Sequence, residues 1–160
     1  GIDQRKILMY AREYLPKVGY KPRIEVMTPL IPGLIGKKMS ASEPKSKIDL
    51  LDDEKTVQEK VRGAYCEEGK LEDNGVLAFL KLVVMPLKQD RKDKFVIERP
   101  AKFGGNISFT SYEDIEDAFV AKKLHPLDLK NGLAKEINAL LELFRKNKAK
   151  LDKIAAEAYN

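Results

Sequence analysis

The first 52 residues contain only one segment with the pattern of a β-strand, which restricts what they can form by themselves. The strand is predicted at 23–27, where apolar and polar residues alternate. A helix is predicted before it, at 3–15, and a loop rich in proline and glycine after it, at 29–44. Helix, strand and loop in this order make half of an α/β unit, and a sheet needs more strands. We therefore expect the partner strands to lie outside these 160 residues, with Gly1 at an interior position of a longer polypeptide.

The pattern changes after Leu51, where helical periodicity dominates. Asp52 or Asp53 can cap a helix, Ser111 can cap another, and Pro126 suits the first turn of a long one. The predicted elements are helices at 54–65, 75–85, 111–123, 126–148 and 150–158, with the second helix ended near Pro86, and short strands at 95–97 and 107–110. We therefore predict two domains, 1–52 and 53–160.

Composition excludes several classes of protein. Because the sequence has a single cysteine, Cys66, no disulfide can form within the chain. With one cysteine and one histidine in all, a zinc site is not expected. We expect no metal ligands and a cytoplasmic location, where thiols stay reduced. No apolar run reaches the roughly 18–20 residues that span a bilayer, so no membrane partner is expected. The net charge of +5 is compatible with a nucleic-acid or phosphate partner.

The loop 36–44 places two adjacent cations, Lys37 and Lys38, among small residues before Pro44. Such a loop can bring cations to a polyphosphate, where charge that develops on phosphorus is stabilised by preplaced donors. The alternative is a plain basic surface loop.

Lys38-Met39-Ser40-Ala41-Ser42 resembles the KMSKS signature of class I aminoacyl-tRNA synthetases, with Ala41 in place of the second lysine. The resemblance implies catalytic roles for Lys38 and Ser40 and contacts to ATP from Met39 and Ser42. We expect Lys37 to supply the second cation.

The first residues, Gly1-Ile2-Asp3-Gln4, resemble the G-x-D-Q motif of tyrosyl- and tryptophanyl-tRNA synthetases. The resemblance implies that Gly1 and Asp3 hold the ribose of ATP or of the adenylate, and that Gln4 reaches the tyrosine substrate. An isolated G-x-D-Q is more often a helix cap, and that alternative weakens because the KMSKS-like loop follows after one helix and one strand.

Three further matches bear on whether the amino acid is tyrosine or tryptophan. They resemble tyrosyl-tRNA synthetases of the archaeal and eukaryotic type: Arg5-Lys6-Ile7, Ala64-Tyr65-Cys66 with Gly69, and the pair KFGGN at 102–106 and LHPLDLKN at 124–131. The tryptophanyl enzymes are the runner-up because their eukaryotic members also use a KMSAS loop. The implied fold is the C-terminal part of a Rossmann-type α/β catalytic domain (1–52), followed by a mostly α-helical anticodon-binding domain with a short β-hairpin (53–160).

The pair of motifs at 102–106 and 124–131 also has a chemical interpretation. Specific RNA recognition uses unstacked bases that stack on aromatic rings and are bonded along their edges. By resemblance, Phe103 and Asp128 read the first anticodon base, and His125 and Cys66 line the same pocket. For each residue alone a structural role is the alternative: Phe103 in the core, Asp128 as a first-turn carboxylate, Cys66 as a small buried apolar group, and His125 as a structural histidine.

The resemblance also implies the reaction and its partners. Tyrosine attacks the α-phosphate of ATP, and the tyrosyl group then passes to tRNA(Tyr). ATP is a substrate accompanied by Mg²⁺, no cofactor is tightly bound, and the full-length protein is expected to be a homodimer. The HIGH-type motif and the groups that bind the tyrosine hydroxyl are absent, so we expect this chain alone to be inactive. A non-catalytic RNA-binding module derived from a synthetase is the competing class, and an unrelated basic nucleotide-binding domain is a third.

Overall fold

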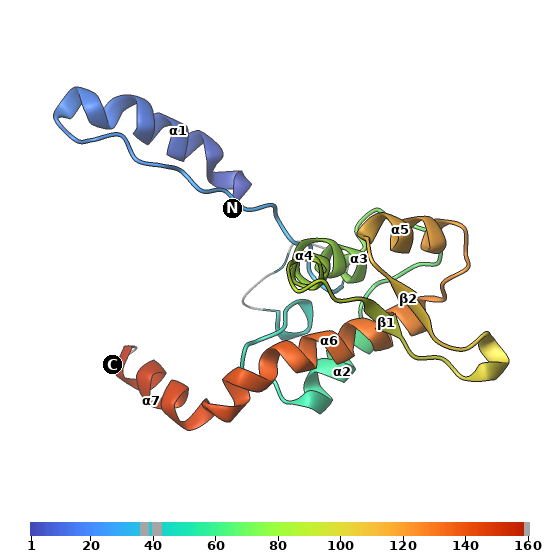
Figure 1. Cartoon of the computed structure of the whole chain (residues 1–160). Helices are drawn as coiled ribbons and strands as arrows, with labels where there is room; N and C mark the ends of the chain where they lie inside the picture. The colour runs from blue at the N-terminus through green and yellow to red at the C-terminus, as the bar shows by residue number, and fades with distance from the viewer. Residues whose placement is uncertain (36–38, 40–42, 159–160) are drawn as a thin grey trace. The chain divides into compact units, whose positions relative to one another are not determined.

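The computed structural model describes residues 1–35, 39 and 43–158. The chain divides into two compact units, Gly1–Leu30 and Ile31–Asn160. Figure 1 shows both, with the chain coloured from its N-terminus to its C-terminus. Each unit is described by itself below.

The first unit is a helix with a return segment. It begins with a 3₁₀ turn, η1 (Ile2–Gln4), which leads directly into α1 (Arg5–Tyr14) and then into η2 (Leu15–Val18). Gly19 ends η2 with a positive φ of 90°, a conformation that suits glycine. The predicted helix at 3–15 is therefore confirmed. Pro16 does not end the helical structure, because it lies within the 3₁₀ turn η2 that follows α1.

The strand predicted at 23–27 is wrong for this chain. The segment has no assigned secondary structure, and Figure 1 shows it running back along α1 as a loop. Its apolar members, Ile24 and Val26, are 90% and 83% exposed. The alternation that suggested a strand is real, but a strand also needs a hydrogen-bonded partner. Residues 1–35 contain no strand that could pair with this segment.

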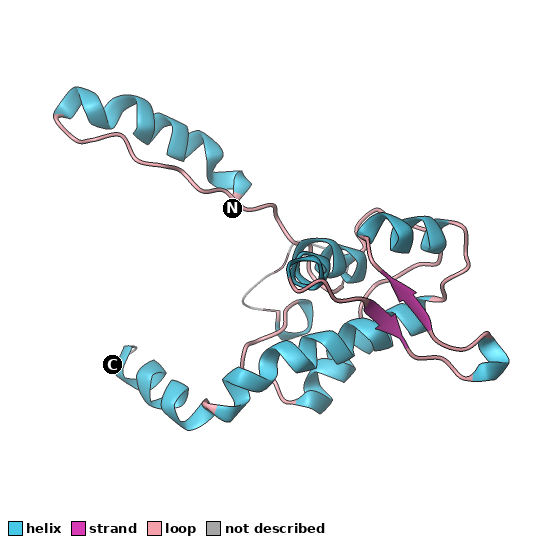
Figure 2. Cartoon of the chain, in the orientation of Figure 1, coloured by secondary structure: helices cyan, strands magenta, loops and turns pink. Residues whose placement is uncertain are grey.

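The second unit is mostly helical, with one small sheet. In addition to two 3₁₀ turns, η3 (Pro44–Ser46) and η5 (Ala101–Phe103), its helical elements are α2 (Glu54–Arg62), α3 (Gly75–Phe79), the π-helical turn η4 (Leu80–Val84), α4 (Met85–Asp90), α5 (Tyr112–Val120), α6 (Pro126–Lys146) and α7 (Lys148–Ala158). Figure 2 shows the hairpin at one side of the unit, with the loop that joins its strands projecting away from the helices. The predicted mixture of helices and one short hairpin is confirmed, and the helix ends lie within three residues of their predicted positions except at the second helix.

Local signals explain where two of these helices begin. Asp53 caps α2 by accepting a hydrogen bond from the Thr56 amide at 2.7 Å. Ser111 caps α5 by accepting one from the Asp114 amide at 3.1 Å. Both caps satisfy amides that a helix start leaves without a partner.

The expectation that the second helix ends near Pro86 is wrong. Helical structure continues to Asp90, with Pro86 in the first turn of α4. Proline in a regular helix interior removes one hydrogen bond and clashes with the carbonyl four residues earlier. Here the turn just before it, η4, has the wider π geometry, so the regular hydrogen-bond pattern is already interrupted where the proline enters.

The hairpin consists of β1 (Phe95–Ile97) and β2 (Ile107–Phe109), which are antiparallel with Phe95 opposite Phe109. It packs against α6 at Gly132. A Cβ at Gly132 would lie 2.9 Å from Phe95 Cζ and 3.1 Å from Ile97 Cγ1. The glycine thus lets the strand approach the helix backbone closely.

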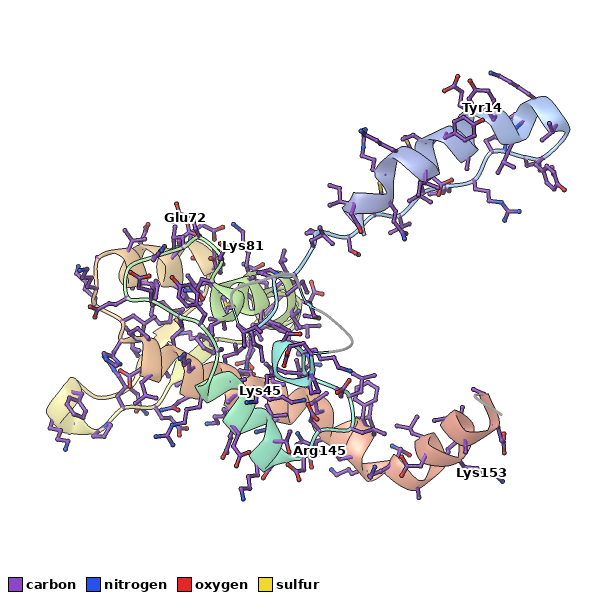
Figure 3. The ribbon with its side chains drawn as sticks, turned by 180° about the vertical axis from the view of Figure 1, so that it is seen from behind. Tyr14, Lys45, Glu72, Lys81, Arg145 and Lys153 are labelled. Carbon is purple, nitrogen blue, oxygen red and sulfur yellow. The ribbon has the colours of Figure 1, made fainter. Side chains whose placement is uncertain are left out.

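The core of the second unit lies between α6 and the elements packed on it. The apolar stripe of α6 contributes Leu129, Leu133, Ile137 and Leu141, which are all buried. Polar contacts fix its partners: Lys88 of α4 forms an ion pair with Glu136 at 2.9 Å. Arg145, labelled in Figure 3, donates to the Asp52 carbonyl at 2.7 Å and so ties the segment before α2 to the end of α6.

Candidate functional site

The G-x-D-Q residues lie on η1, at the start of the first unit. A Cβ at Gly1 would lie 2.6 Å from Asp3 Oδ1, so the glycine leaves room for that carboxylate. The turn is held because the Ile2 amide donates to the Thr28 carbonyl at 2.9 Å. Asp3 and Gln4 are exposed, and Gln4 forms the N-cap position of α1. Both side chains are therefore available to a ligand.

The KMSKS-like motif is described only in part. Lys37, Lys38, Ser40, Ala41 and Ser42 lie outside the described residues, and Met39 is half-buried.

The flanks of the motif are well defined within the second unit. Leu34 is fully buried, and its amide donates to the Ser46 carbonyl at 2.9 Å. Its carbonyl accepts from the Tyr65 amide at 2.6 Å. The segments on either side of the motif are therefore joined to each other and to the segment that precedes Cys66.

Phe103 lies at the end of η5, in the loop that joins β1 to β2. Its side chain is 62% exposed, so the interpretation of Phe103 as a core residue does not hold. The next two residues, Gly104 and Gly105, have φ of 93° and 72°. Two successive residues in this region strongly favour glycine, which explains this part of the motif. Lys102 Nζ lies 5.0 Å from the centre of the Phe103 ring.

Two residues that the sequence reasoning did not select hold this loop. Arg99 Nε donates to the Gly105 carbonyl at 3.0 Å. The Arg99 amide donates to Asn106 Oδ1 at 3.1 Å. Asn106 ends the KFGGN motif, whereas the only sequence signal for Arg99 was its position next to a predicted strand, which is weak.

His125 and Asp128 lie at the start of α6. His125 is exposed and forms the N-cap: its Nδ1 accepts a hydrogen bond from the Leu127 amide at 3.1 Å. Asp128 is half-exposed in the first helical turn, where the helix dipole favours a negative charge. Within the described part of the chain no donor pairs with its carboxylate. A carboxylate in this state can accept hydrogen bonds from a ligand.

Cys66 is half-buried beside the start of α3. The Asn74 side-chain amide donates to its sulfur at 3.5 Å and to the Lys70 carbonyl at 3.1 Å. Asn74 also caps α3 through the Leu77 amide. Burial raises the pKa of the Cys66 thiol, against the smaller opposing effects of Asn74 and the charge of Lys130. Among the described residues no hydrogen bond joins Cys66, His125 and Asp128 to one another.

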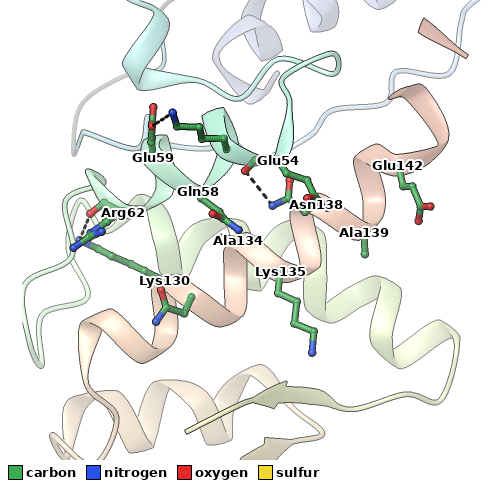
Figure 4. A pocket seen from close by; sticks show the side chains of 12 residues that line it. Glu54, Gln58, Glu59, Arg62, Lys130, Ala134, Lys135, Asn138, Ala139 and Glu142 are labelled. Carbon is green, nitrogen blue, oxygen red and sulfur yellow. Dashed lines mark hydrogen bonds and ion pairs between the residues drawn. The ribbon is translucent and has the colours of Figure 1, made fainter. Parts of the chain in front are cut away.

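A groove of about 860 Å³ runs between α2 and α6 (Figure 4). Several of its charged side chains form ion pairs: Lys55 with Glu59 at 3.9 Å, and Glu142 with Lys146 at 2.6 Å. Lys130 donates to the Arg62 carbonyl at 3.1 Å. Among the described residues, none of the predicted site residues lines the groove, although Lys130 and Asn131 of the LHPLDLKN motif do. The charge pattern of the groove does not favour one class of ligand.

Comparisons with known proteins bear on both units. The family model described as "tRNA synthetases class I (W and Y)" matches residues 1–142. The chain therefore belongs to the class I tRNA synthetases of the tryptophan and tyrosine type. The assignment to this family, made first from the order of the motifs, is confirmed.

The relatives point to the tyrosyl branch. The chain is 48% identical over 161 residues to the cytoplasmic tyrosine–tRNA ligase of Gallus gallus, covering 99% of this chain and 30% of that protein. It is 44% identical to the tyrosine–tRNA ligase of Haloarcula marismortui, covering 99% of this chain and 46% of that one. The chain thus spans about a third to a half of the length of these relatives.

Solved structures agree. The crystal structure of tyrosyl-tRNA synthetase from Archaeoglobus fulgidus, complexed with L-tyrosine, matches with a TM-score of 0.82 and 44% identity, covering 91% of this chain and 44% of that one. A tryptophanyl-tRNA synthetase from Encephalitozoon cuniculi matches with a TM-score of 0.62 and 20% identity, covering 93% and 37%. At that identity the second match speaks for the fold alone. The tyrosyl resemblance is therefore confirmed over the tryptophanyl one.

No helix among the described residues is both long and apolar enough to cross a membrane.

Proposed function

We propose that the full-length protein is a tyrosine–tRNA ligase. A carboxylate oxygen of tyrosine attacks the α-phosphorus of ATP, and the bond to pyrophosphate breaks. The tyrosyl group of the adenylate then passes to a ribose hydroxyl at the 3′ end of tRNA(Tyr), and AMP leaves. The proposal is supported by relatives of this name that match 99% of the chain at 44–48% identity.

Residues 1–52 contribute to activation of tyrosine in this proposal, as part of a Rossmann-type domain. Gly1 and Asp3 hold the ribose, and Gln4 contacts tyrosine. Lys38, Ser40, Met39 and Ser42 meet the phosphates of ATP, with Lys37 as the second cation and Mg²⁺ accompanying the nucleotide. Positioning and charge stabilisation suffice, because no side chain has to act as a nucleophile. The exposure of Asp3 and Gln4 on a fixed turn supports their roles.

Residues 53–160 form the anticodon-binding domain in this proposal, and the protein works as a homodimer in the cytoplasm. Phe103 stacks on the first anticodon base, and Asp128 accepts hydrogen bonds from the edge of a guanine at that position. His125 and Cys66 line the pocket. The observation that carries this assignment is the 62% exposure of an aromatic ring on a fixed turn, in a chain whose Asp128 carboxylate has no described partner. Stacking and edge bonding of unpaired bases use these two groups.

The test compares binding of the full-length protein to a tyrosine tRNA transcript and to the same transcript changed at the first anticodon base, at one fixed salt concentration. We expect the change to weaken binding by about 1–3 kcal/mol, the cost of one misread base. Asp128→Asn should remove most of this difference. Glu59→Gln serves as the matched control, because it also neutralises one exposed carboxylate of the same unit.

Equal binding of both transcripts by the wild-type protein would contradict the anticodon assignment. Tyrosine-dependent exchange of pyrophosphate into ATP tests catalysis separately. Discrimination between transcripts without exchange would indicate a non-catalytic RNA-binding module.

A further inference from the structure

The loop that carries Phe103 has a feature that glycine alone does not explain. Gly104 and Gly105 both adopt positive φ, and this is what turns the chain back towards β2. Glycine reaches this conformation easily but reaches many others equally well. The same two residues that permit the turn therefore leave its direction weakly determined, unless another group restrains them.

The restraint comes from Arg99, which lies two residues after the end of β1. The Nε of Arg99 donates to the Gly105 carbonyl at 3.0 Å. Its terminal nitrogen Nη2 lies 3.6 Å from where a Cβ of Gly104 would be, so the guanidinium lies against both glycines. Arg99 is half-buried, whereas Phe103 itself is exposed.

The base of the loop is closed by a second side chain. Asn106 Oδ1 accepts from the Arg99 amide at 3.1 Å. The Pro100 carbonyl accepts from the amides of Phe103 at 2.9 Å and of Gly105 at 3.3 Å. Backbone and side-chain bonds therefore hold the segment 99–106, which carries the ring.

Lys102 adds a distinction between the two faces of the ring. Its ammonium lies 5.0 Å from the ring centre, within the range of a cation–π interaction. This contact leaves the opposite face of Phe103 for a stacked base. Because only one face serves, the direction of the ring decides whether a stacked base also meets its hydrogen-bonding groups.

We propose that Arg99, braced by Asn106, is a positioning residue that sets the orientation of Phe103 and thereby the selectivity for the first anticodon base. This inference rests on the proposed function. It assigns Arg99 a role in discrimination between RNAs and not in general affinity. A guanidinium is suited to the task because its donors form a rigid planar fork, whereas a lysine ammonium is a single flexible point charge.

The test uses the full-length protein, the two transcripts described above and one fixed salt concentration. The variants are Arg99→Lys, which keeps the charge and loses the fork, and Arg91→Lys, a matched control at an exposed arginine outside the loop. Wild type and Arg91→Lys are expected to discriminate by about tenfold or more. Arg99→Lys is expected to bind the changed transcript as wild type does and to lose most of the discrimination.

Asn106 provides a second test that does not alter Arg99. Asn106→Ala removes the acceptor for the Arg99 amide and should lower discrimination in the same direction. Asn106→Asp keeps an acceptor oxygen and should restore it. Thermal midpoints of all variants should stay close to that of wild type, because the loop lies outside the core.

Two outcomes overturn the inference, and they are distinguishable. If wild type binds both transcripts alike, the anticodon-reading function fails and the inference fails with it. If wild type discriminates and Arg99→Lys discriminates equally well, only the role of Arg99 fails. In the second case Arg99→Gln tests the alternative: equal weakening of both transcripts, with a salt slope lowered by roughly 0.7–0.9, would make Arg99 a phosphate contact.

Discussion

Gly132→Ala sets two known effects against each other at one position of α6. Glycine in a helix interior costs about 1 kcal/mol relative to alanine, so propensity alone predicts a gain in stability. The new Cβ, however, would lie 2.9 Å from Phe95 Cζ and 3.1 Å from Ile97 Cγ1. Both side chains are fully buried and cannot move into solvent. Adding a methyl group to a packed core costs about 1–3 kcal/mol.

The geometry decides which effect wins. We expect the overpacking to exceed the gain in propensity, which leaves the variant about 1 kcal/mol less stable, or about 3 °C lower in melting temperature for a unit of this size. Because Gly132 sets β1 against α6, the variant should also discriminate less well between the two transcripts. Thermal unfolding and transcript binding, measured on the same preparation, check both effects.

Gly63→Ala is the matched control. Gly63 ends α2 with a φ of −78°, which alanine adopts without strain, and its Cβ would meet Glu59 O at an ordinary 3.4 Å. This variant should be as stable as wild type or up to about 1 kcal/mol more stable. A Gly132→Ala protein that melts above wild type would refute the argument, because it would mean that the close approach of β1 to α6 does not limit the size of residue 132.

Three further predictions concern caps and titrating groups. His125→Ala should lower stability by about 1 kcal/mol and His125→Asn should largely keep it, because asparagine also caps helices, and denaturant unfolding checks both. Burial raises the pKa of the Cys66 thiol, so the rate of its alkylation should increase at a higher pH than that of a free cysteine. An alkylation rate whose pH midpoint equals or lies below that of a free cysteine would contradict this prediction. The hydrogen bonds from Thr56 hold the pKa of Asp53 below its ordinary value. Its contribution to stability is therefore fully present above that ordinary value and is lost as pH falls through the lowered pKa. In Asp53→Asn this part of the acid dependence should vanish from the unfolding profile.

Local chemistry made much of the second unit predictable. Asp53, Ser111 and Pro126 mark helix starts by the hydrogen bonds and backbone angles that they supply, and these signals lie within a few residues of the structures they set. The hairpin was predictable for the same reason, since Gly104-Gly105 marks a turn between two short apolar runs. Family resemblance, and not periodicity, supplied the candidate site residues.

The remainder depended on contacts between distant residues or on missing partners. The alternation at 23–27 carries no information on whether a neighbouring strand is present. The role of Arg99 depends on a carbonyl six residues away, and a bond from a side chain to a backbone atom leaves no pattern in the sequence. Pro86 misled because the π geometry before it is a property of the hydrogen bonds and not of residue types. The roles assigned to the motif residues stay predictions until binding is measured.

The π-helical turn η4 also determines where the chain can change length. A π turn holds about one residue more than an α turn, because its hydrogen bonds join residues five apart and not four. Deletion of one residue at 80–84 that restored a regular helix would therefore leave α3 and α4 facing nearly as they do now, with Lys88 beside Glu136 and Met85 in the core. Deletion of one residue inside α3 or α4 would instead rotate the residues that follow by about 100°. Within 75–90, one-residue differences in length among proteins of this fold should therefore gather at 80–84.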